Sequence, residues 1–262
     1  MKQYLNLLSD VKHNGTWQDN RTGVRTLMIP GAMLKFDLRD GFPAVTTKKL
    51  AYRSVVGELL GFLNGAHTVA EFNALGCRVW DANGAATNGE LGPIYGVAWR
   101  QHDQIGKLLE TIRYNPQSRR MIVTAWLPDL IPDMALPPCH YSFQIIIEQS
   151  SRTMHLIWNQ RSCDLFLGIP FNIASYATLL SLLACVTGYN VGTVTGMLAD
   201  VHIYENHLSQ VEEQLSRAPL APTALLLAGH LYKSWSLDGI MPADIELHNY
   251  VSHPAILAPM AL

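Results

Sequence analysis

The sequence predicts a single domain of the α+β class over residues 1–262, and three observations support this prediction. Segments with the apolar spacing of helices share the chain with segments of strand character. Hydrophobic residues make up 48% of the 262 residues, which is enough for one sizeable core. No repeat, low-complexity tract, linker or glycine-rich nucleotide loop divides the chain, so one domain is the simplest interpretation.

The overall composition argues against several classes of protein. The formal net charge of −2 fits neither a nucleic-acid coat protein nor a polybasic membrane binder. The four cysteines lie far apart without a CxxC pair, so neither a zinc site nor a secreted disulfide framework is indicated. Residues 1–4 open no apolar signal run, and the apolar tract 173–186 looks too short to span a bilayer. These features predict a cytoplasmic protein with no metal, no membrane anchor and no dedicated nucleic-acid site.

The first part of the chain predicts a helix, a strand and a buried helix, in that order. Residues 1–19 have apolar side chains at helical spacing, and a polar turn at 20–23 precedes a strand-like run to Phe36. Residues 55–63 are apolar enough for a buried helix. Glu58 shares their apolar stripe, where a carboxylate needs a partner or a raised pKa. We favour a functional carboxylate over one that only pairs with an arginine.

The middle of the chain predicts an irregular region followed by a helix and two strands. Residues 77–102 mix aromatic residues and glycines without periodicity, which is typical of segments that line a site or cap a core. A helix is predicted over 103–113, and strands over 121–126 and 141–147.

The stretch 158–176 places polar residues inside strongly apolar surroundings. It predicts a strand through Gln160, a loop across 168–170 and an apolar helix from about Asn172. Polar groups are costly to bury without partners, so they either satisfy one another or bind a polar ligand. We favour a ligand, because strand ends and helix starts suit a phosphate and the edges of a ring.

The last part of the chain predicts a strand at 200–204, a helix at 206–217, a strand at 223–227 and an apolar tail. The alternation at 200–204 puts three polar side chains on one face, which is either a ligand site or an exposed strand face. The tail from Tyr250 ends without polar residues, so it either docks in the core or closes over a site.

Two short motifs carry reactive or charged groups whose role the local pattern leaves open. Cys139 stands between Pro138 and His140 at a loop–strand junction. A neighbouring cation there would lower the pKa of the thiol, yet a lone cysteine is also ordinary core filler. Arg119 and Arg120 precede a strand, and such a pair either recognises phosphate or stays solvated.

Taken together and in order, the motifs resemble the thymidylate synthase family almost from end to end. The matching segments are Asn20–Gly23, Gly41–Pro43, Glu58–Leu60, Gly92–Gly96, Ser118–Arg120, Pro137–His140, Gln160–Asp164, Pro170–Tyr176 and His202–Tyr204. Each is a weak signal alone, whereas the ordered set is highly specific. The resemblance implies a large mixed sheet with flanking helices that dimerises through the sheet face.

The resemblance also implies the catalytic residues. They are Cys139, Glu58, Tyr95, His140, Arg161 and Asn172. In this family a thiolate adds to C6 of a uracil ring, and C5 then becomes a carbon nucleophile. Cys139 would be that thiolate, with Arg161 favouring the anion. Glu58 would manage protons through ordered water, and Tyr95 would assist removal of the C5 proton.

The implied binding residues for dUMP come from two subunits. They are Arg21, Arg119, Arg120, Gln160, Arg161, Ser162, Asp164, Asn172, His202 and Tyr204. Arg119 and Arg120 would reach the phosphate from the partner, which implies an isologous homodimer with shared sites. Asn172 would read the O4 and N3 edge of the base, and an amide there selects uracil. His202 and Tyr204 would hold the 3′-hydroxyl of the sugar.

The cosubstrate implied by the resemblance is 5,10-methylenetetrahydrofolate. It would stack over the base near Trp80, with Asp164 gripping the pterin and the tail around Ala261 closing the lid. Lys48 and Lys49 would attract a glutamate tail on the folate. The expected products are dTMP and dihydrofolate.

Several positions depart from the family pattern, and we expect nearly all of them to touch the folate side. They are Ala51, Gly61, Ala82, Asn83, Asn159 and Leu198–Asp200, together with a short segment between Arg100 and Asp103. A loosened aromatic lid would admit water to the methylene intermediate. The alternative hypothesis is therefore a deoxyuridylate hydroxymethylase that forms 5-hydroxymethyl-dUMP. A third hypothesis is a catalytically idle nucleotide-binding protein.

Overall fold

A six-stranded mixed sheet forms the centre of the molecule in the computed structural model, which describes residues 1–260. Its strands, in spatial order, are β1 (Thr16–Gln18), β2 (Thr26–Asp37), β6 (Asn190–Tyr204), β5 (Thr153–Asp164), β4 (His140–Glu148) and β3 (Ile122–Thr124). Only β5 and β6 are parallel. A separate antiparallel pair is formed by β7 (Ala224–Leu227) and β8 (Ile245–His248).

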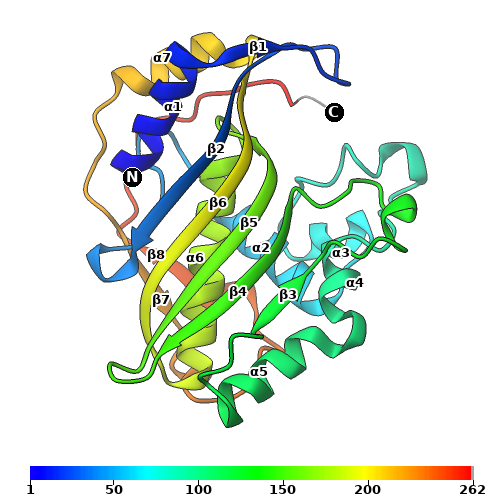
Figure 1. Ribbon diagram of the computed structural model, residues 1–262, viewed down its shortest axis with the longest axis vertical. Helices are drawn as coiled ribbons and strands as arrows, with labels where there is room; N and C mark the ends of the chain where they lie inside the picture. The colour runs from blue at the N-terminus through cyan, green and yellow to red at the C-terminus, as the bar shows by residue number, and fades with distance from the viewer. Residues whose placement is uncertain (261–262) are drawn as a thin grey trace.

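Helices cover one face of this sheet. They are α1 (Lys2–Asn14), α2 (Tyr52–Asn64), α3 (Val69–Ala74), α4 (Tyr95–Arg100), α5 (Gln104–Tyr114), α6 (Gly168–Thr187) and α7 (Leu208–Ser216). Figure 1 shows α6 and α2 behind the sheet, and within the described residues no helix crosses in front of β4, β5 and β6. The predicted α+β class with a large mixed sheet and flanking helices is confirmed.

The alternation of side chains along β5 explains the two faces. Trp158 points to the helical face, where it stacks on Tyr176 of α6 with ring centroids 5.2 Å apart. His155 and Asn159 lie on the opposite face, because successive side chains of a strand point to opposite sides. We call this opposite side of the sheet, across strands β2, β6, β5, β4 and β3, the open face.

The crossover from β5 through α6 to β6 places the ends of two parallel strands side by side. Parallel strands need such a connection, and here the crossover helix is the core of the protein. Asp164 therefore lies opposite His202 in the ladder, at the end where both strands finish. The polar residues predicted to meet a ligand gather at this end.

Several predicted boundaries need correction. The first helix ends at Asn14 rather than 19, because the following residues pair with β2 as β1. The region 77–102 contains α4, which its glycines and aromatic residues concealed. The expected loop across 168–170 is wrong, because α6 begins at Gly168. Pro170 fits in its first turn, where backbone N–H groups have no partner within the helix.

The apolar tract inside α6 is also longer than predicted. The helix has 20 residues and is apolar enough to cross a membrane by length and composition, but 83% of that window is buried within the fold. Packing against the sheet and α2 therefore accounts for its apolar character.

The other elements agree in type with their predictions, but the strand predicted at 200–204 is only the end of β6, which begins at Asn190. The predicted strand to Phe36, the buried helix 55–63 and the helix 103–113 correspond to β2, α2 and α5. The predicted strands at 121–126, 141–147, 200–204 and 223–227 fall on β3, β4, β6 and β7, and the helix at 206–217 on α7.

We expect Gly196→Ala to lower the free energy of unfolding by about 1–3 kcal/mol, because overpacked cores cost this much. A Cβ at position 196 would lie 2.3 Å from the ring of Trp158. Urea denaturation measures the change, and Gly229→Ala is the control because its Cβ would meet nothing within 4 Å. In a Trp158→Leu background the cost of Gly196→Ala should shrink. An equal cost in both backgrounds would contradict this packing account.

Candidate active site

The predicted site residues gather where β4 begins and where β5 and β6 end. In the strand ladder His140 pairs with Gln160, and Asp164 pairs with His202. Cys139 lies one residue before β4, and Asn172 lies in the first turns of α6. Residues from four parts of the sequence therefore lie together at one end of the sheet.

Cys139 is held in place from both sides. Its backbone N–H donates to the hydroxyl of Tyr95 at 2.7 Å. Arg161 donates from Nε to the carbonyl of Pro138 and from Nη2 to that of Pro137, each at 2.9 Å. The strand carrying Arg161 thus fixes the proline loop that presents the thiol. Nη1 of Arg161 has no hydrogen-bond partner within residues 1–260.

Two opposing effects set the ionisation of this thiol. Burial raises the pKa of Cys139 above its ordinary value, while Arg161 and Arg21 act in the opposite direction. The arrangement is typical of a partly enclosed nucleophile that neighbouring cations activate. The side chain of Cys139 is half-buried, whereas that of Cys163, near the end of β5, is fully buried.

Buried amides form a chain that fixes Asn172. Trp158 Nε1 donates to Gln160 Oε1 at 3.1 Å, and Gln160 Nε2 donates to Asn172 Oδ1 at 3.0 Å. The indole can only donate, so it determines the orientation of the Gln160 amide. Asn172 keeps one acceptor lone pair on Oδ1, and its Nδ2 has no partner among the described residues. It therefore offers one acceptor and a donor side by side.

Glu58 is buried, and among residues 1–260 it has one hydrogen bond, from Trp80 Nε1 at 3.1 Å. Burial raises the pKa of Glu58 to about 8, and the bond from the indole lowers it only in part. The carboxyl group is consequently protonated at neutral pH and can donate.

The missing side chain of Gly61 leaves no gap in the aromatic wall that Trp80 and Phe72 form. A Cβ at position 61 would lie 2.3 Å from the ring of Phe72, so that ring fills the space. Phe72 also stacks on Trp80 with centroids 5.8 Å apart at 26°. The wall is therefore closed by a residue from α3, which the sequence analysis did not identify.

His140 and Tyr95 lie against one another below the cysteine. Their rings stack with centroids 4.3 Å apart, and His140 Nδ1 is 2.9 Å from the hydroxyl of Tyr176. Burial lowers the pKa of His140 to about 3, so the imidazole is neutral. The pKa of Tyr95 is raised by its own burial, so it remains a phenol. Tyr176 is a further site residue that the sequence analysis did not identify.

Four residues lie toward the predicted phosphate and sugar positions. Arg21 is an exposed residue of the loop between β1 and β2, close enough for its charge to act on Cys139 and Tyr204. Ser162 contacts the thiol and favours its anion. His202 is buried and its Nδ1 lies 2.7 Å from Asp200 Oδ1, which leaves Nε2 for a ligand. The polar residues predicted at 200–204 therefore include one buried imidazole with a nitrogen that is free among the described residues.

On the folate side the structure modifies the expectations. Asp164 Oδ1 accepts from the backbone N–H groups of Phe166 and Leu167 at 2.9 and 3.2 Å, so one oxygen of this carboxylate is bound to the turn that leads into α6. Lys48 is buried, with its ammonium on the carbonyl and ring of Phe166, so of the two lysines only Lys49 is exposed. Ala261 lies outside the described residues.

Asn159 does not face the folate side. It lies on the open face of the sheet, where its Nδ2 donates to Ser142 Oγ at 3.1 Å. The expectation that this departure touches folate is wrong, because odd-numbered residues of β5 point away from α6 at this point.

Arg119 and Arg120 are not brought to the cluster of their own chain. Both are exposed and precede β3, which pairs with β4 from Ile122 opposite Gln144. Gln144 is five residues along β4 from Cys139, which is about 17 Å at about 3.4 Å per residue. Two cavities, of about 490 Å³ beside α5 and about 550 Å³ at the end of α6, also contain none of the predicted site residues.

Comparison with known proteins gives a consistent result over the whole chain. A family model described as thymidylate synthase matches residues 2–262. Curated proteins named thymidylate synthase from Pseudomonas putida and Bordetella parapertussis are 38% and 37% identical to it, with 100% of each chain covered. A thymidylate synthase from Pseudomonas syringae is 37% identical over the same span. The alignments extend over 323 positions against 262 residues, so these relatives have segments that this chain lacks.

The raised pKa of Glu58 predicts how stability depends on pH. Between 4.5 and about 8 the unfolded carboxyl releases a proton that the folded one keeps, so stability falls as pH rises. His140 acts in the opposite direction only between about 3 and 6.5. From pH 6.5 to 8 we therefore expect unfolding free energy to fall by about 1.4 kcal/mol per pH unit through Glu58.

Glu58→Gln should remove this slope, because glutamine still accepts from Trp80 but does not titrate. Urea denaturation at several pH values between 6.5 and 8 measures it. Glu71→Gln is the control, because that carboxylate has a lowered pKa and is ionised throughout the window. A slope that survives in Glu58→Gln would show that another group is responsible.

Proposed function

The chain belongs to the thymidylate synthase family, and we propose that the cluster around Cys139 carries out the reaction. The protein is a methyltransferase. It transfers a one-carbon unit from 5,10-methylenetetrahydrofolate to C5 of dUMP, with reduction, and gives dTMP and dihydrofolate. The observation that carries the residue assignment is the half-buried thiol fixed between Tyr95 and Arg161. The relatives favour reduction over the hydroxymethylase alternative.

Cys139 acts as the nucleophile toward C6 of the uracil ring. Its sulfur forms a bond to C6, and the electron pair of the ring double bond moves to C5. Arg161 and Arg21 stabilise the thiolate against the effect of burial. Because Nε and Nη2 of Arg161 are bound to proline carbonyls, its Nη1 is the group left for the nucleotide phosphate.

Asn172 selects the base through the two groups it leaves unpaired. Its Nδ2 donates to O4 of uracil, and the remaining lone pair of Oδ1 accepts from N3–H. Gln160 fixes the amide in this orientation. Cytosine has an amino group and an unprotonated nitrogen at these positions, so the same amide would be mismatched.

Glu58 and Tyr95 handle protons. Glu58 is protonated at neutral pH and supplies a proton toward O4 through water. Tyr95 accepts the N–H of Cys139 with its oxygen, so its own proton is directed elsewhere, and it assists loss of the C5 proton. His140 stays neutral and helps to orient this group through Tyr176.

The residues of the folate side determine whether hydride or water completes the reaction. Trp80 is buried between Glu58 and Phe72, and Asp164 retains one carboxylate oxygen that is not bound to the turn before α6. We assign these two residues, with Ala261, to the folate. A closed aromatic wall keeps water from the methylene carbon, so that hydride from the folate is transferred instead.

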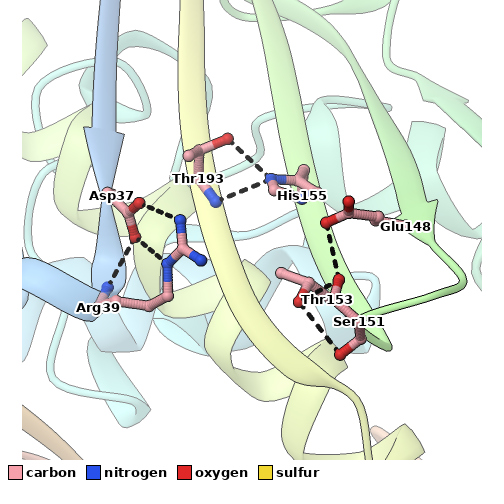
Figure 2. A network of polar contacts seen from close by, with 7 residues as sticks. All are labelled: Asp37, Arg39, Glu148, Ser151, Thr153, His155 and Thr193. Atoms are coloured by element: carbon pink, nitrogen blue, oxygen red, sulfur yellow. Dashed lines mark hydrogen bonds and ion pairs between the residues drawn. The ribbon is translucent and has the colours of Figure 1, made fainter.

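We propose further that two chains assemble through the open face. Four exposed apolar side chains from four different strands lie on it, Met33, Ile122, Ile146 and Met197. An apolar surface of this kind is typical of an interface. Figure 2 shows the polar end of the same face, where His155 of β5 bonds to Thr193 of β6 near the Asp37–Arg39 pair.

This assembly would bring Arg119 and Arg120 to the phosphate site of the partner. Their own site is too far away, because about 17 Å of strand separates it from them. We also propose that residues 1–262 act as one domain, supported by a single contiguous core. A cytoplasmic location is supported by four cysteines that are all free thiols.

Incubation with dUMP and 5,10-methylenetetrahydrofolate tests the proposed reaction. We expect a nucleotide with the mass of dTMP and one dihydrofolate for each dUMP consumed, because hydride transfer oxidises the folate. Cys139→Ala should abolish turnover while the protein still folds. A product with the mass of 5-hydroxymethyl-dUMP, without dihydrofolate, would instead support the alternative.

Mixing two inactive variants tests the shared site. Cys139→Ala in one chain, and Arg119→Ala with Arg120→Ala in the other, should each be inactive alone. After co-refolding in equal amounts we expect about a quarter of wild-type activity, because half of the dimers are mixed and each contains one intact site. A mixture that stays inactive, while its chains do exchange, would refute the contribution from the partner.

A further inference from the structure

His207 is a fully buried imidazole that the reaction as described does not use. It lies between the end of β6 and the start of α7, so its ring is next to the nucleotide side of the site. The ring centroids of Tyr204 and Phe166 are each 5.5 Å from its own. Tyr204 is assigned to the sugar, and Phe166 follows Asp164 at the start of α6.

One nitrogen of His207 holds the C-terminal tail. Nε2 is 2.7 Å from the backbone carbonyl of Pro259. A carbonyl can only accept, so Nε2 carries the proton and donates. The tail is already anchored further back, where the hydroxyl of Tyr250 donates to Val45 O and the N–H of His253 donates to Thr46 O. In Figure 1 the tail passes below α7 toward the upper end of the sheet.

The other nitrogen of His207 lies toward Asp164, the carboxylate assigned to the pterin. Nδ1 is buried and has no hydrogen-bond partner among the described residues. Asp164 Oδ1 lies 4.0 Å from Nδ1. Buried polar atoms are rarely left unpaired, and those that are call for an explanation. Here the ring lies directly between the tail and the carboxylate assigned to the pterin.

We propose that His207 is a positioning residue that couples the seating of the C-terminal tail to the folate half of the site. This inference rests on the proposed function. When Nε2 holds Pro259, the ring is fixed with Nδ1 toward Asp164, and the tail, His207 and Asp164 form one connected unit. Loss of the Pro259 contact releases the tail and disturbs the folate side, whereas the dUMP contacts of Asn172 and Gln160 remain.

Two substitutions distinguish the role of Nε2 from that of Nδ1. In His207→Gln the amide nitrogen has the same bond separation from Cβ as Nε2, so it keeps the donor to Pro259. In His207→Asn the amide has the bond separation of Nδ1 and cannot reach the tail. His230→Asn is the matched control, because His230 is exposed and distant in the fold.

Steady-state kinetics and amide hydrogen exchange provide the test. We expect His207→Asn to raise KM for 5,10-methylenetetrahydrofolate about tenfold, with KM for dUMP within about twofold, because one buried hydrogen bond is lost. Exchange in residues 254–260 should be faster in His207→Asn, and close to wild type in His207→Gln. Equal increases in both KM values, unchanged tail exchange, or equal behaviour of Gln and Asn would overturn the proposal.

A chain that ends at Ala258 gives a second test if His207→Asn does not fold. By calorimetry we expect its binding of dUMP to stay within about twofold of wild type, and its binding of the folate to weaken by about tenfold or more. Equal effects on both ligands, or none, would count against the coupling. If wild type forms no dTMP, the proposed function fails, and tail exchange in the variants still decides the role of His207.

Discussion

The guanidinium of Arg161 is the interaction on which the rest of the site depends. This group binds the carbonyls of Pro137 and Pro138 to the end of β5. The backbone N–H of Arg161 also donates to Cys139 O at 2.8 Å. The loop that presents the thiol is therefore tied to the central sheet at three points. The same positive charge opposes the effect of burial on the pKa of Cys139. One residue thus fixes both the position and the ionisation of the nucleophile.

Around Arg161, buried polar side chains are hydrogen-bonded in pairs, and among the described residues each pair leaves one donor or acceptor without a partner, available for a ligand. Gln160 satisfies Asn172 on one side and leaves its donor for a ligand, and Trp80 satisfies Glu58 without ionising it. Burying such groups is costly unless they are hydrogen-bonded, so the networks also restrict each side chain to one orientation. The site is consequently organised before any substrate binds, which is how fixed dipoles assist a reaction without reorganising.

The sequence predicted most of this arrangement because its signals are local. Periodicity identified α2 and β2, and the polar residues in an apolar stretch pointed to β5 and α6. It did not predict Phe72, Tyr176 or His207, because each acts through a contact distant in sequence: with Gly61, with His140 and with Pro259. Asn159 was misplaced for a related reason, since the face on which a strand residue lies depends on register. The loop before α6 was misplaced because a proline in the first helical turn resembles a breaker.

Intact-protein mass spectrometry with 5-fluoro-dUMP and 5,10-methylenetetrahydrofolate tests the central claim most directly. Fluorine at C5 cannot leave as a proton does, so the covalent adduct on the nucleophile should persist. The account predicts an added mass equal to nucleotide plus folate, located by peptide mapping on Cys139 and absent in Cys139→Ala. An adduct on Cys163, Cys77 or Cys185, or no adduct on a folded protein that forms dTMP, would contradict it.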